Sequence, residues 1–509
     1  MQKETVIEGP IAYGVAQSYD YNTTNRAKQL EYLDQVGREY IQRGNPQFYD
    51  ANFLEEHISA LKERQAGENF SFSWAPENPP GNFLNINTQK DGIVIRDPIS
   101  IENLEKTLKN EPDIKALVVS IYLNGYSVFR DISEHLRKVH PEIKIIAGAV
   151  GATIPETSQL SDYSLKGNQI DDLRKLLGED SRPLKVSVVP SHTQTTYSNQ
   201  AKNSTIGVMM SSYGCFYQCD FCPATAQFKG KFTAPHSADE IISAIDYAHR
   251  MLGKEDEVIS LSLADPQGMG DIPTWKEIFK RCRNLGYTVE LATTTSSKIL
   301  KQYSPAEITE GDLCVTCVNI GVESMLNPYA KNDNVDLKEE IKEYQSAGVK
   351  IATTFIIGHD WHSRQNIGHE IDQLQELNPS GFIVSNMMME PDTLVFKKMQ
   401  QNGRLLNVPP EFLTSYGFQA FTHPYFESGF NDMVPLLAEI EDKLNQGTAM
   451  FGRDIEIYLN RNNHRISPLQ ARLKDKLREA DGDDERAMIF YSTIFRNIDL
   501  FHPYLTWNV

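Results

Sequence analysis

Six apolar, β-rich runs alternate with helix-like segments in the middle of the chain. The runs cover residues 205–210, 258–264, 289–295, 314–322, 349–357 and 382–388. Nearly continuous apolar sequence is typical of strands that are buried on both faces of a parallel sheet. One helix between them begins at a capping box, Ser237 to Glu240, and is expected to end at Gly253; another, over 337–347, is stopped by Gly348. The alternation predicts successive βα units and a parallel sheet.

A second α/β pattern precedes these units. Residues 116–124 are expected to form a buried strand, followed by an amphipathic helix through Lys138. Residues 143–147 form the next strand and lead into the loop 148–153. Residues 163–168 and the helix 169–177 complete the pattern. A doubly wound fold of this kind binds ligands at the carboxyl ends of its strands. Residues 12–110 are long, polar and partly helical, so the first strand is not assigned, and residues 73–81 are interpreted as a loop or linker. The pattern predicts a Rossmann-like unit.

The region after Leu405 has a different character. It contains helix-like segments at 433–446 and 469–481, followed by an aromatic-rich tail over 490–507. We therefore divide the chain into three domains, residues 1–195, 196–404 and 405–509. The first two have α/β patterns, and the third is mainly helical.

Composition narrows the class of protein. Of the 509 residues, 40% are hydrophobic and 23% are charged, which suits globular packing, and the net charge of −18 argues against sequence-independent binding of nucleic acid. The longest apolar run, residues 116–123, has the length of a strand and not of a membrane span. The first residues lack the apolar segment of a secretory signal. Six cysteines, clustered at one site, suggest a reducing compartment, and we expect a cytoplasmic protein.

Three of the cysteines carry the most specific chemistry. Cys215, Cys219 and Cys222 have the spacing C-x-x-x-C-x-x-C. Three thiolates can ligate three irons of a [4Fe–4S] cluster and leave the fourth iron open, whereas electron-carrying clusters commonly have four cysteine ligands. A zinc site is the alternative, but zinc usually takes a fourth Cys or His at short spacing, and the nearest candidate, His236, lies beyond a loop. The motif predicts an iron–sulfur centre at which chemistry takes place.

With the aromatic Phe221 before its third cysteine, this motif resembles that of the radical S-adenosylmethionine (SAM) superfamily. The resemblance implies that SAM chelates the open iron, that Phe221 contacts SAM, and that one electron from the cluster cleaves SAM to methionine and a 5′-deoxyadenosyl radical. In such enzymes the cofactor supplies the difficult chemistry, and the protein positions the parts and excludes water. The resemblance also implies a partial (β/α)6 barrel for residues 196–404 and an electron donor such as flavodoxin or ferredoxin.

The ends of the predicted strands supply candidate SAM contacts. On the fourth strand, Asn319 and Glu323 share one face by alternation, and a carboxylate facing the interior needs a partner. Residues 319–324, followed by Tyr329-Ala-Lys331, resemble the family's Ile-Gly-x-Glu-Ser stretch, which implies SAM binding by Asn319 and Glu323. Asp265 follows the second strand where relatives carry a SAM-contacting loop. A helix cap or a buried salt bridge is the alternative for both carboxylates.

The remaining cysteines are not expected to hold a second cluster. Cys314 and Cys317 lie three apart on one predicted strand and so point to opposite faces. Buried cysteine usually behaves as a small hydrophobic residue, which is our interpretation of Cys314 and Cys282. Cys317, on the interior face, stays open as a hydrogen-atom donor or thiyl site.

The segments between 116 and 177 resemble the cobalamin-binding domain of the cobalamin-dependent radical SAM class. In that class the second strand ends in a Gly-Gly-Pro-x-Ala-Thr-like loop, whose place residues 148–153 take, and a later Gly-Glu-Gly-Glu-like turn corresponds to residues 166–168. The D-x-H-x-x-G signature of other cobalamin proteins is absent, as it commonly is in this class. The resemblance implies that cobalamin is bound through Ser120, Gly148, Gly151, Thr153 and Gly167.

Taken together, the two resemblances imply a cobalamin-dependent radical SAM enzyme. Such an enzyme methylates an unactivated carbon of a small-molecule, peptide or lipid substrate through the 5′-deoxyadenosyl radical and methylcobalamin. Two alternatives stay open. In the first alternative, the cobalamin domain is vestigial or non-methylating, and the enzyme cyclises, epimerises or rearranges its substrate. In the second alternative, the chain is a non-catalytic iron–sulfur protein.

Overall fold

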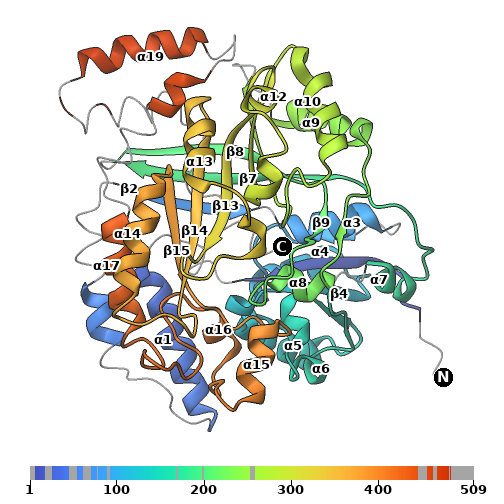
Figure 1. Cartoon of the computed structure of the whole chain (residues 1–509). Coiled ribbons are helices and arrows are strands. Elements are labelled where there is room, and N and C mark those ends of the chain that lie inside the picture. Colours follow the sequence, from blue (N-terminus) through green and yellow to red (C-terminus); the bar gives the residue numbers. More distant parts are fainter. Residues whose placement is uncertain are drawn as a thin grey trace.

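Two large sheets organise the molecule, one wholly parallel and one mixed (Figure 1). The computed structural model describes residues 6–17, 26–44, 54–60, 70–76, 78–88, 92–167, 170–197, 200–252, 258–444, 456–461, 467–480, 482 and 486. All statements below concern these residues.

The first sheet has five parallel strands and a doubly wound order. The strands run, in spatial order, β3 (Gly92–Val94), β1 (Ile11–Ala16), β4 (Ala116–Ile121), β5 (Lys144–Gly148) and β6 (Tyr163–Ser164). The described helices that follow its strands are α1 (Arg26–Gln42), α4 (Ile101–Asn110), α5 (Tyr126–Val139), α6 (Thr157–Leu160) and α7 (Ile170–Leu176). The strands and helices predicted between residues 116 and 177 are therefore present, which confirms the Rossmann-like pattern.

Two corrections concern residues before 110. The unassigned first strand is β1, whose six residues are all buried between β3 and β4. The segment 73–81, interpreted as a loop or linker, instead contains the end of β2 (Phe70–Pro76) and the start of α3 (Pro79–Asn87). Asn78 caps this helix, since its side chain accepts from Gly81 N, and Pro79 occupies the first helical position, where its missing N–H costs nothing. The prolines therefore mark a helix start.

The second sheet has eight strands. Their spatial order is β15 (Gly381–Asn386), β14 (Lys350–Ile357), β13 (Leu313–Glu323), β12 (Thr288–Thr295), β11 (Val258–Leu263), β8 (Gln200–Met210), β7 (Ser187–Tyr197) and β2. The six predicted strands are neighbours in sequence order and pair in parallel, as the alternation predicted. Closure into a barrel stays a prediction.

An antiparallel extension of this sheet was missed. β7 pairs with β8 along their whole length, and β2 adds to the far side of β7. The first predicted strand therefore begins five residues earlier than expected, at Gln200. The division into three domains stays a prediction, and its boundary at residue 195 falls inside β7.

Helices alternate with the parallel strands of the second sheet. They are α9 (Ala238–Leu252), α10 (Ile272–Arg281), α11 (Ser297–Leu300), α12 (Pro305–Thr309), α13 (Leu337–Ser346), α14 (Ile367–Leu377) and α15 (Leu394–Gln401). Of these, α9 and α13 are the two that the sequence located. The capping box of α9 is formed, because Ser237 N donates to Glu240 and Glu240 N donates to Ser237 Oγ. Gly348 follows α13 with a positive φ of 87°, as a helix stop requires. Gly253 lies outside the described residues.

The C-terminal region packs against elements of both sheets. Its described elements include α16 (Pro410–Leu413), α17 (Met433–Leu444) and α19 (Ser467–Glu479). α17 and α19 agree with the two predicted helices, whereas α16 was not predicted and the aromatic tail lies outside the described residues. α16 lies beside α5 (Figure 1), and Ser127 N at the start of α5 donates to Glu411 Oε1 at 2.6 Å. One hydrophobic cluster joins Phe129, Phe412 and Phe221 and so connects all three regions.

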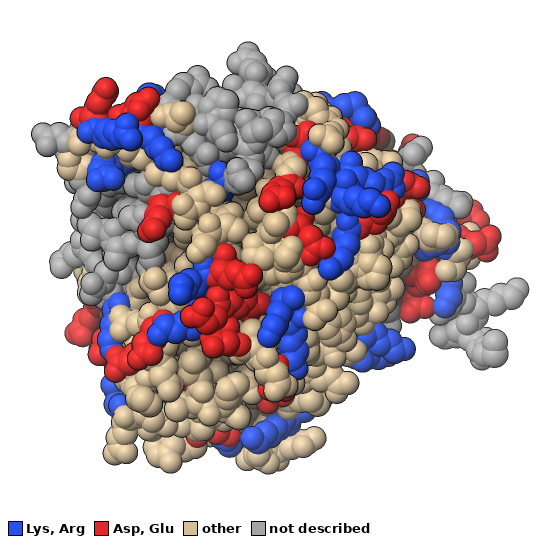
Figure 2. Space-filling view, turned by 45° about the horizontal axis from the view of Figure 1, so that its top comes forward, with Lys and Arg blue, Asp and Glu red and all other residues tan. Residues whose placement is uncertain are grey.

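The surface carries charges of both signs. On the face drawn in Figure 2, basic side chains lie among acidic ones, and wide areas are uncharged. Within the described ranges, every helix is too short or too polar to traverse a bilayer. The absence of nucleic-acid binding stays a prediction.

Candidate functional site

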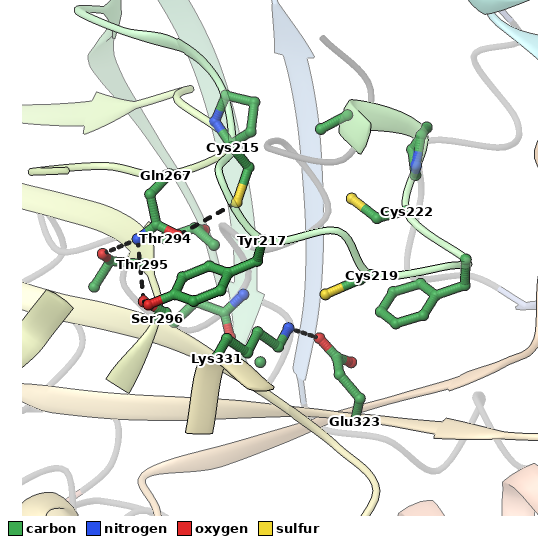
Figure 3. Close-up of a pocket in the computed structure, with 16 residues that line it drawn as sticks. Cys215, Tyr217, Cys219, Cys222, Gln267, Thr294, Thr295, Ser296, Glu323 and Lys331 are labelled. Atoms are coloured by element: carbon green, nitrogen blue, oxygen red, sulfur yellow. Dashed lines mark hydrogen bonds and ion pairs between the residues drawn. The ribbon is translucent and has the colours of Figure 1, made fainter. Parts of the chain in front are cut away.

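The three cysteines lie in a loop that begins directly after β8. The short strands β9 (Tyr213–Gly214) and β10 (Phe232–Thr233) pair antiparallel and close the base of this loop. Within it, Cys222 N donates to Cys219 O at 3.2 Å, and Cys222 is the N-terminal cap of α8 (Pro223–Phe228). The three sulfur atoms face the same space (Figure 3). The loop geometry thus gathers the cysteines as the motif predicted.

A pocket at the carboxyl ends of β11, β12 and β13 contains these sulfurs. It also contains three of the residues predicted to contact SAM, namely Phe221, Asn319 and Glu323. Further lining residues are Tyr217, Pro223, Ala224, Pro266, Gln267, Thr294, Thr295, Ser296, Gly321 and Lys331. Asn319, Gly321 and Glu323 all line the pocket, which confirms that these alternate residues of β13 face the same side. Cys317 is buried but does not line the pocket, and Cys314 and Cys282 are buried as expected.

The chemistry of the donor set fits an iron–sulfur cluster. Burial raises the pKa of Cys215 to about 11 and of Cys219 to about 12, so a positive metal centre is what would stabilise their thiolates. In the part of the chain that the structure describes, no three His, Cys, Asp or Glu side chains are placed to hold one metal ion. Sulfurs spread around a pocket suit a multinuclear cluster better than zinc. His236, the alternative zinc ligand, does not line this pocket.

A buried ion pair lies beside the cysteines. Lys331 Nζ, from η4 (Ala330–Asn332), is 2.5 Å from Glu323 Oε1, and Thr354 Oγ1 donates to Glu323 Oε2 at 2.8 Å. Burial opposes the charge of Lys331, but Glu323 and the cysteines outweigh it and raise the lysine pKa. The partner that Glu323 needs is therefore supplied by the chain itself. Sequence reasoning missed this role of Lys331 because it depends on how the loop after β13 folds.

The backbone around this ion pair is unusual. Glu323 has a φ of +64°, in the left-handed region, which costs about 1–3 kcal/mol for a residue other than glycine. The register between β13 and β14 shifts between Gly321 and Glu323. A Cβ on Gly321 would lie 2.1 Å from Lys331 Nζ and 2.3 Å from Glu323 Oε1. The close approach of the ion pair to the strand therefore requires glycine at 321.

Asn319 offers hydrogen-bonding groups to a ligand. The side chain is 3% exposed and lines the pocket, and neither its amide oxygen nor its nitrogen has a hydrogen-bond partner among the described residues. A buried polar atom without a partner costs about 1–3 kcal/mol. A ligand with both a donor and an acceptor would satisfy this amide.

Asp265 lies behind the pocket and does not line it. Its carboxylate accepts from Ser211 N at 2.8 Å, Ser211 Oγ at 2.5 Å and Ser212 Oγ at 2.9 Å, and burial raises its pKa to about 6. Its neighbour Pro266 lines the cysteine pocket. In the structure, Asp265 therefore joins the ends of β11 and β8, and its contact with SAM stays a prediction.

A second cavity, of about 160 Å³, lies at the carboxyl ends of β4 and β5. Ser120, Gly148 and Gly167 line it, together with residues of α3 and of the second sheet. The buried hydroxyl of Tyr213 in its wall has no hydrogen-bond partner among the described residues, so the cavity presents an unsatisfied polar group as well as apolar walls. A cavity therefore lies where the sequence predicted a Rossmann-like binding site.

Two residues predicted to bind cobalamin lie outside this cavity. Gly151 and Thr153 belong to η2 (Val150–Thr153), which curls away after β5. A Cβ on Gly151 would lie 2.3 Å from Ile121 Cγ2, and Thr153 Oγ1 donates to Val150 O at 2.6 Å. In this structure Gly151 allows close packing on β4, and the Thr153 hydroxyl is bonded within its own turn.

The helix α8 connects the two sites. Pro223 and Ala224 line the cysteine pocket, while Gln227 and Phe228, at the other end of α8, line the second cavity. The backbone N–H groups of Thr225 and Ala224 donate to the Cys222 sulfur. The motif located one end of this helix, and no signal in the sequence indicated where the other end lies.

Comparison with known proteins gives likeness in structure only. No family model matches the chain, and no curated protein sequence matches it. The radical SAM methyltransferase TsrM from Kitasatospora setae, solved with cobalamin and a [4Fe–4S] cluster bound, is similar with a TM-score of 0.50 and 10% identity over 96% of this chain and 99% of that one. TsrM with tryptophan substrate and the SAM analogue aza-SAM has a TM-score of 0.49 and 9% identity over 93% and 99%. Over nearly its whole length, the chain is therefore similar in fold to a radical SAM methyltransferase.

Proposed function

We propose that the chain is a cobalamin-dependent radical SAM enzyme that methylates an unactivated carbon of an organic substrate. Cys215, Cys219 and Cys222 hold a [4Fe–4S] cluster, SAM binds in the same pocket, and cobalamin binds in the second cavity. The observation that carries the proposal is α8, which lines the cysteine pocket at one end and the Rossmann-like cavity at the other. The likeness to TsrM supports the arrangement of the fold.

The residues of the cysteine pocket hold and shield the reacting parts. When bound, the cluster supplies the electron that cleaves SAM, and cobalamin carries the methyl group. The free amide of Asn319 suits the amino and carboxylate groups of SAM, and Glu323 with Lys331 forms the charged wall beside it. Phe221 is 6% exposed, lies edge-on to Tyr329 and keeps water from the cysteine loop. Asp265 fixes the turn that leads into the cysteines, and its own contact with SAM remains part of the proposal.

The second cavity has mainly apolar walls with a few polar groups. Ser120, Gly148 and Gly167 line the edge of the first sheet, and the unpartnered Tyr213 hydroxyl lies in the wall. The described residues that line the cavity include no histidine, so a cobalamin held there would receive no imidazole nitrogen from them. Gly151 and Thr153 shape the loop next to the cavity. The substrate is a small molecule, a peptide or a lipid, and the electron donor is of the flavodoxin or ferredoxin class.

Anaerobic reconstitution tests the proposal. The protein should bind about four irons per chain and cleave SAM to 5′-deoxyadenosine on reduction. Cys219→Ala should abolish both, whereas Cys282→Ala, at a buried cysteine outside the pocket, should retain both. Zinc in place of iron, or normal cleavage in the Cys219 variant, contradicts the proposal.

Cobalamin uptake separates the open alternatives. Co-purified cobalamin with a spectrum that lacks an axial nitrogen base excludes a vestigial cobalamin domain. Cleavage of SAM by protein that binds no cobalamin favours cyclisation, epimerisation or rearrangement. A stable cluster with no SAM cleavage favours a non-catalytic iron–sulfur protein.

A further inference from the structure

The side-chain amide of Gln267 is held against the sulfur of Cys215. Gln267 follows β11 by a few residues and is 2% exposed. Its Nε2 donates to Thr295 Oγ1 at 2.6 Å and to Ser296 Oγ at 3.4 Å, and its Oε1 is 3.6 Å from Cys215 Sγ (Figure 3). The amide is therefore pinned between two hydroxyl groups and one cluster ligand.

Iron binding changes Cys215 from a hydrogen-bond donor to an acceptor toward this amide. A free thiol donates to the amide oxygen, as observed, but a cysteine bound to iron is a thiolate and has no proton to donate. The hydroxyl of Thr295 can donate or accept, so the amide can turn over and keep its bond to Thr295. After this turn Nε2 points at the sulfur and Oε1 accepts from Thr295.

We propose that Gln267 donates an N–H···S hydrogen bond to iron-bound Cys215 and thereby raises the reduction potential of the cluster. Reduction adds negative charge, part of it on the sulfurs, and hydrogen bonds to the sulfurs stabilise the reduced form. The backbone N–H of Tyr217 also donates to Cys215, but no substitution removes it. Gln267 is thus a positioning residue that acts through Cys215. The inference rests on the proposed cluster.

A redox titration without SAM, followed by electron paramagnetic resonance, tests this role. Gln267→Leu and Gln267→Glu both remove the donor, and each should lower the ratio of reduced to oxidised cluster roughly tenfold at a fixed potential. For a one-electron couple this is a shift of about 59 mV to more negative potential. The matched control is Gln419→Leu, a buried glutamine that does not line the pocket, whose potential should equal that of the parent.

A second readout tests the hydrogen bond directly. In the parent, transfer to D₂O should shift the iron–cysteine stretching bands in the resonance Raman spectrum, and Gln267→Leu should reduce that shift. If Gln267→Leu fails to take up iron, Thr295→Val keeps the glutamine but removes its anchor, and the potential should again fall. Unchanged potentials in variants with a full iron content overturn the inference alone. A parent protein that takes up no cluster instead contradicts the proposed function.

Discussion

Lys331 Nζ lies 2.5 Å from Glu323 Oε1, in a buried position that also borders the three cysteines. The two residues are eight positions apart, one at the end of β13 and the other in η4. Their charges neutralise each other before any ligand enters. The pocket therefore presents a fixed pair of opposite charges to whatever binds beside the cysteines.

Replacing Lys331 should lower the free energy of unfolding, because the buried carboxylate of Glu323 then lacks a counter-charge. Lys331→Met leaves Glu323 without its counter-charge, and breaking one side of a buried pair typically costs about 3–5 kcal/mol in the free energy of unfolding. Urea denaturation of the iron-free protein measures this. The control is Lys443→Met, which breaks the exposed pair with Asp372 and should cost less than about 1 kcal/mol. Equal losses would contradict the role of burial.

Gly321→Ala should disrupt the same pair without removing a charge. The new Cβ would lie within 2.3 Å of both Lys331 Nζ and Glu323 Oε1, so at least one side chain must move. We expect SAM binding to the reconstituted enzyme to weaken at least roughly tenfold, the effect of losing a single good polar contact. Equilibrium dialysis with labelled SAM measures this. Gly368→Ala, where a Cβ meets nothing within 4 Å, should bind SAM as the parent does.

Filling the second cavity should prevent cobalamin from binding without affecting the iron–sulfur cluster. A Cβ on Gly148 meets only Val119 O at 3.7 Å, so the side chain of Gly148→Trp can enter the cavity without a clash at its base. We expect the variant to lose cobalamin from its absorption spectrum and to keep the iron content of the parent. Gly368→Trp, at an open surface position, should retain both. Full cobalamin binding by Gly148→Trp would place the cofactor elsewhere.

The Asp265 carboxyl should make stability depend on pH. Burial raises its pKa in the folded protein from 3.8 to about 6, so between these values the folded state binds more protons than the unfolded state. Stability from this group is therefore present below about pH 4 and decreases as the pH rises to about 6, by about 3 kcal/mol in total. Asp265→Asn should lack this component. Denaturation of both proteins at pH 4, 5, 6 and 7 measures the difference, and parallel curves would refute it.

Much of the fold was predictable because strands buried on both faces are nearly continuous apolar runs. All six runs of the second sheet and the strands β4 and β5 follow that rule. The strands that were missed do not. β2 alternates aromatic and serine residues, and β7 is rich in threonine and other polar residues, as in antiparallel strands near a sheet edge. β1 was hidden by the long polar segments that follow it.

The candidate site was predictable where local spacing decides geometry. The cysteine motif and the alternation along β13 placed Cys215, Asn319 and Glu323 in one pocket. The roles of Lys331 and Gln267 could not be predicted, because they depend on loops that bring distant segments together. The cobalamin contact of Thr153 stays a prediction, and in the structure its hydroxyl donates to Val150 O within the turn of η2.

The short helix α8 sets the distance between the cysteine pocket and the second cavity. Six residues span roughly 9 Å, so its length fixes the gap between the cysteine loop and the neighbouring cavity. One inserted residue would lengthen it by roughly 1.5 Å and swing Gln227 and Phe228 by about 100°, out of the wall they now form. Insertions and deletions should therefore be tolerated far less in this helix than in the surface connections around it.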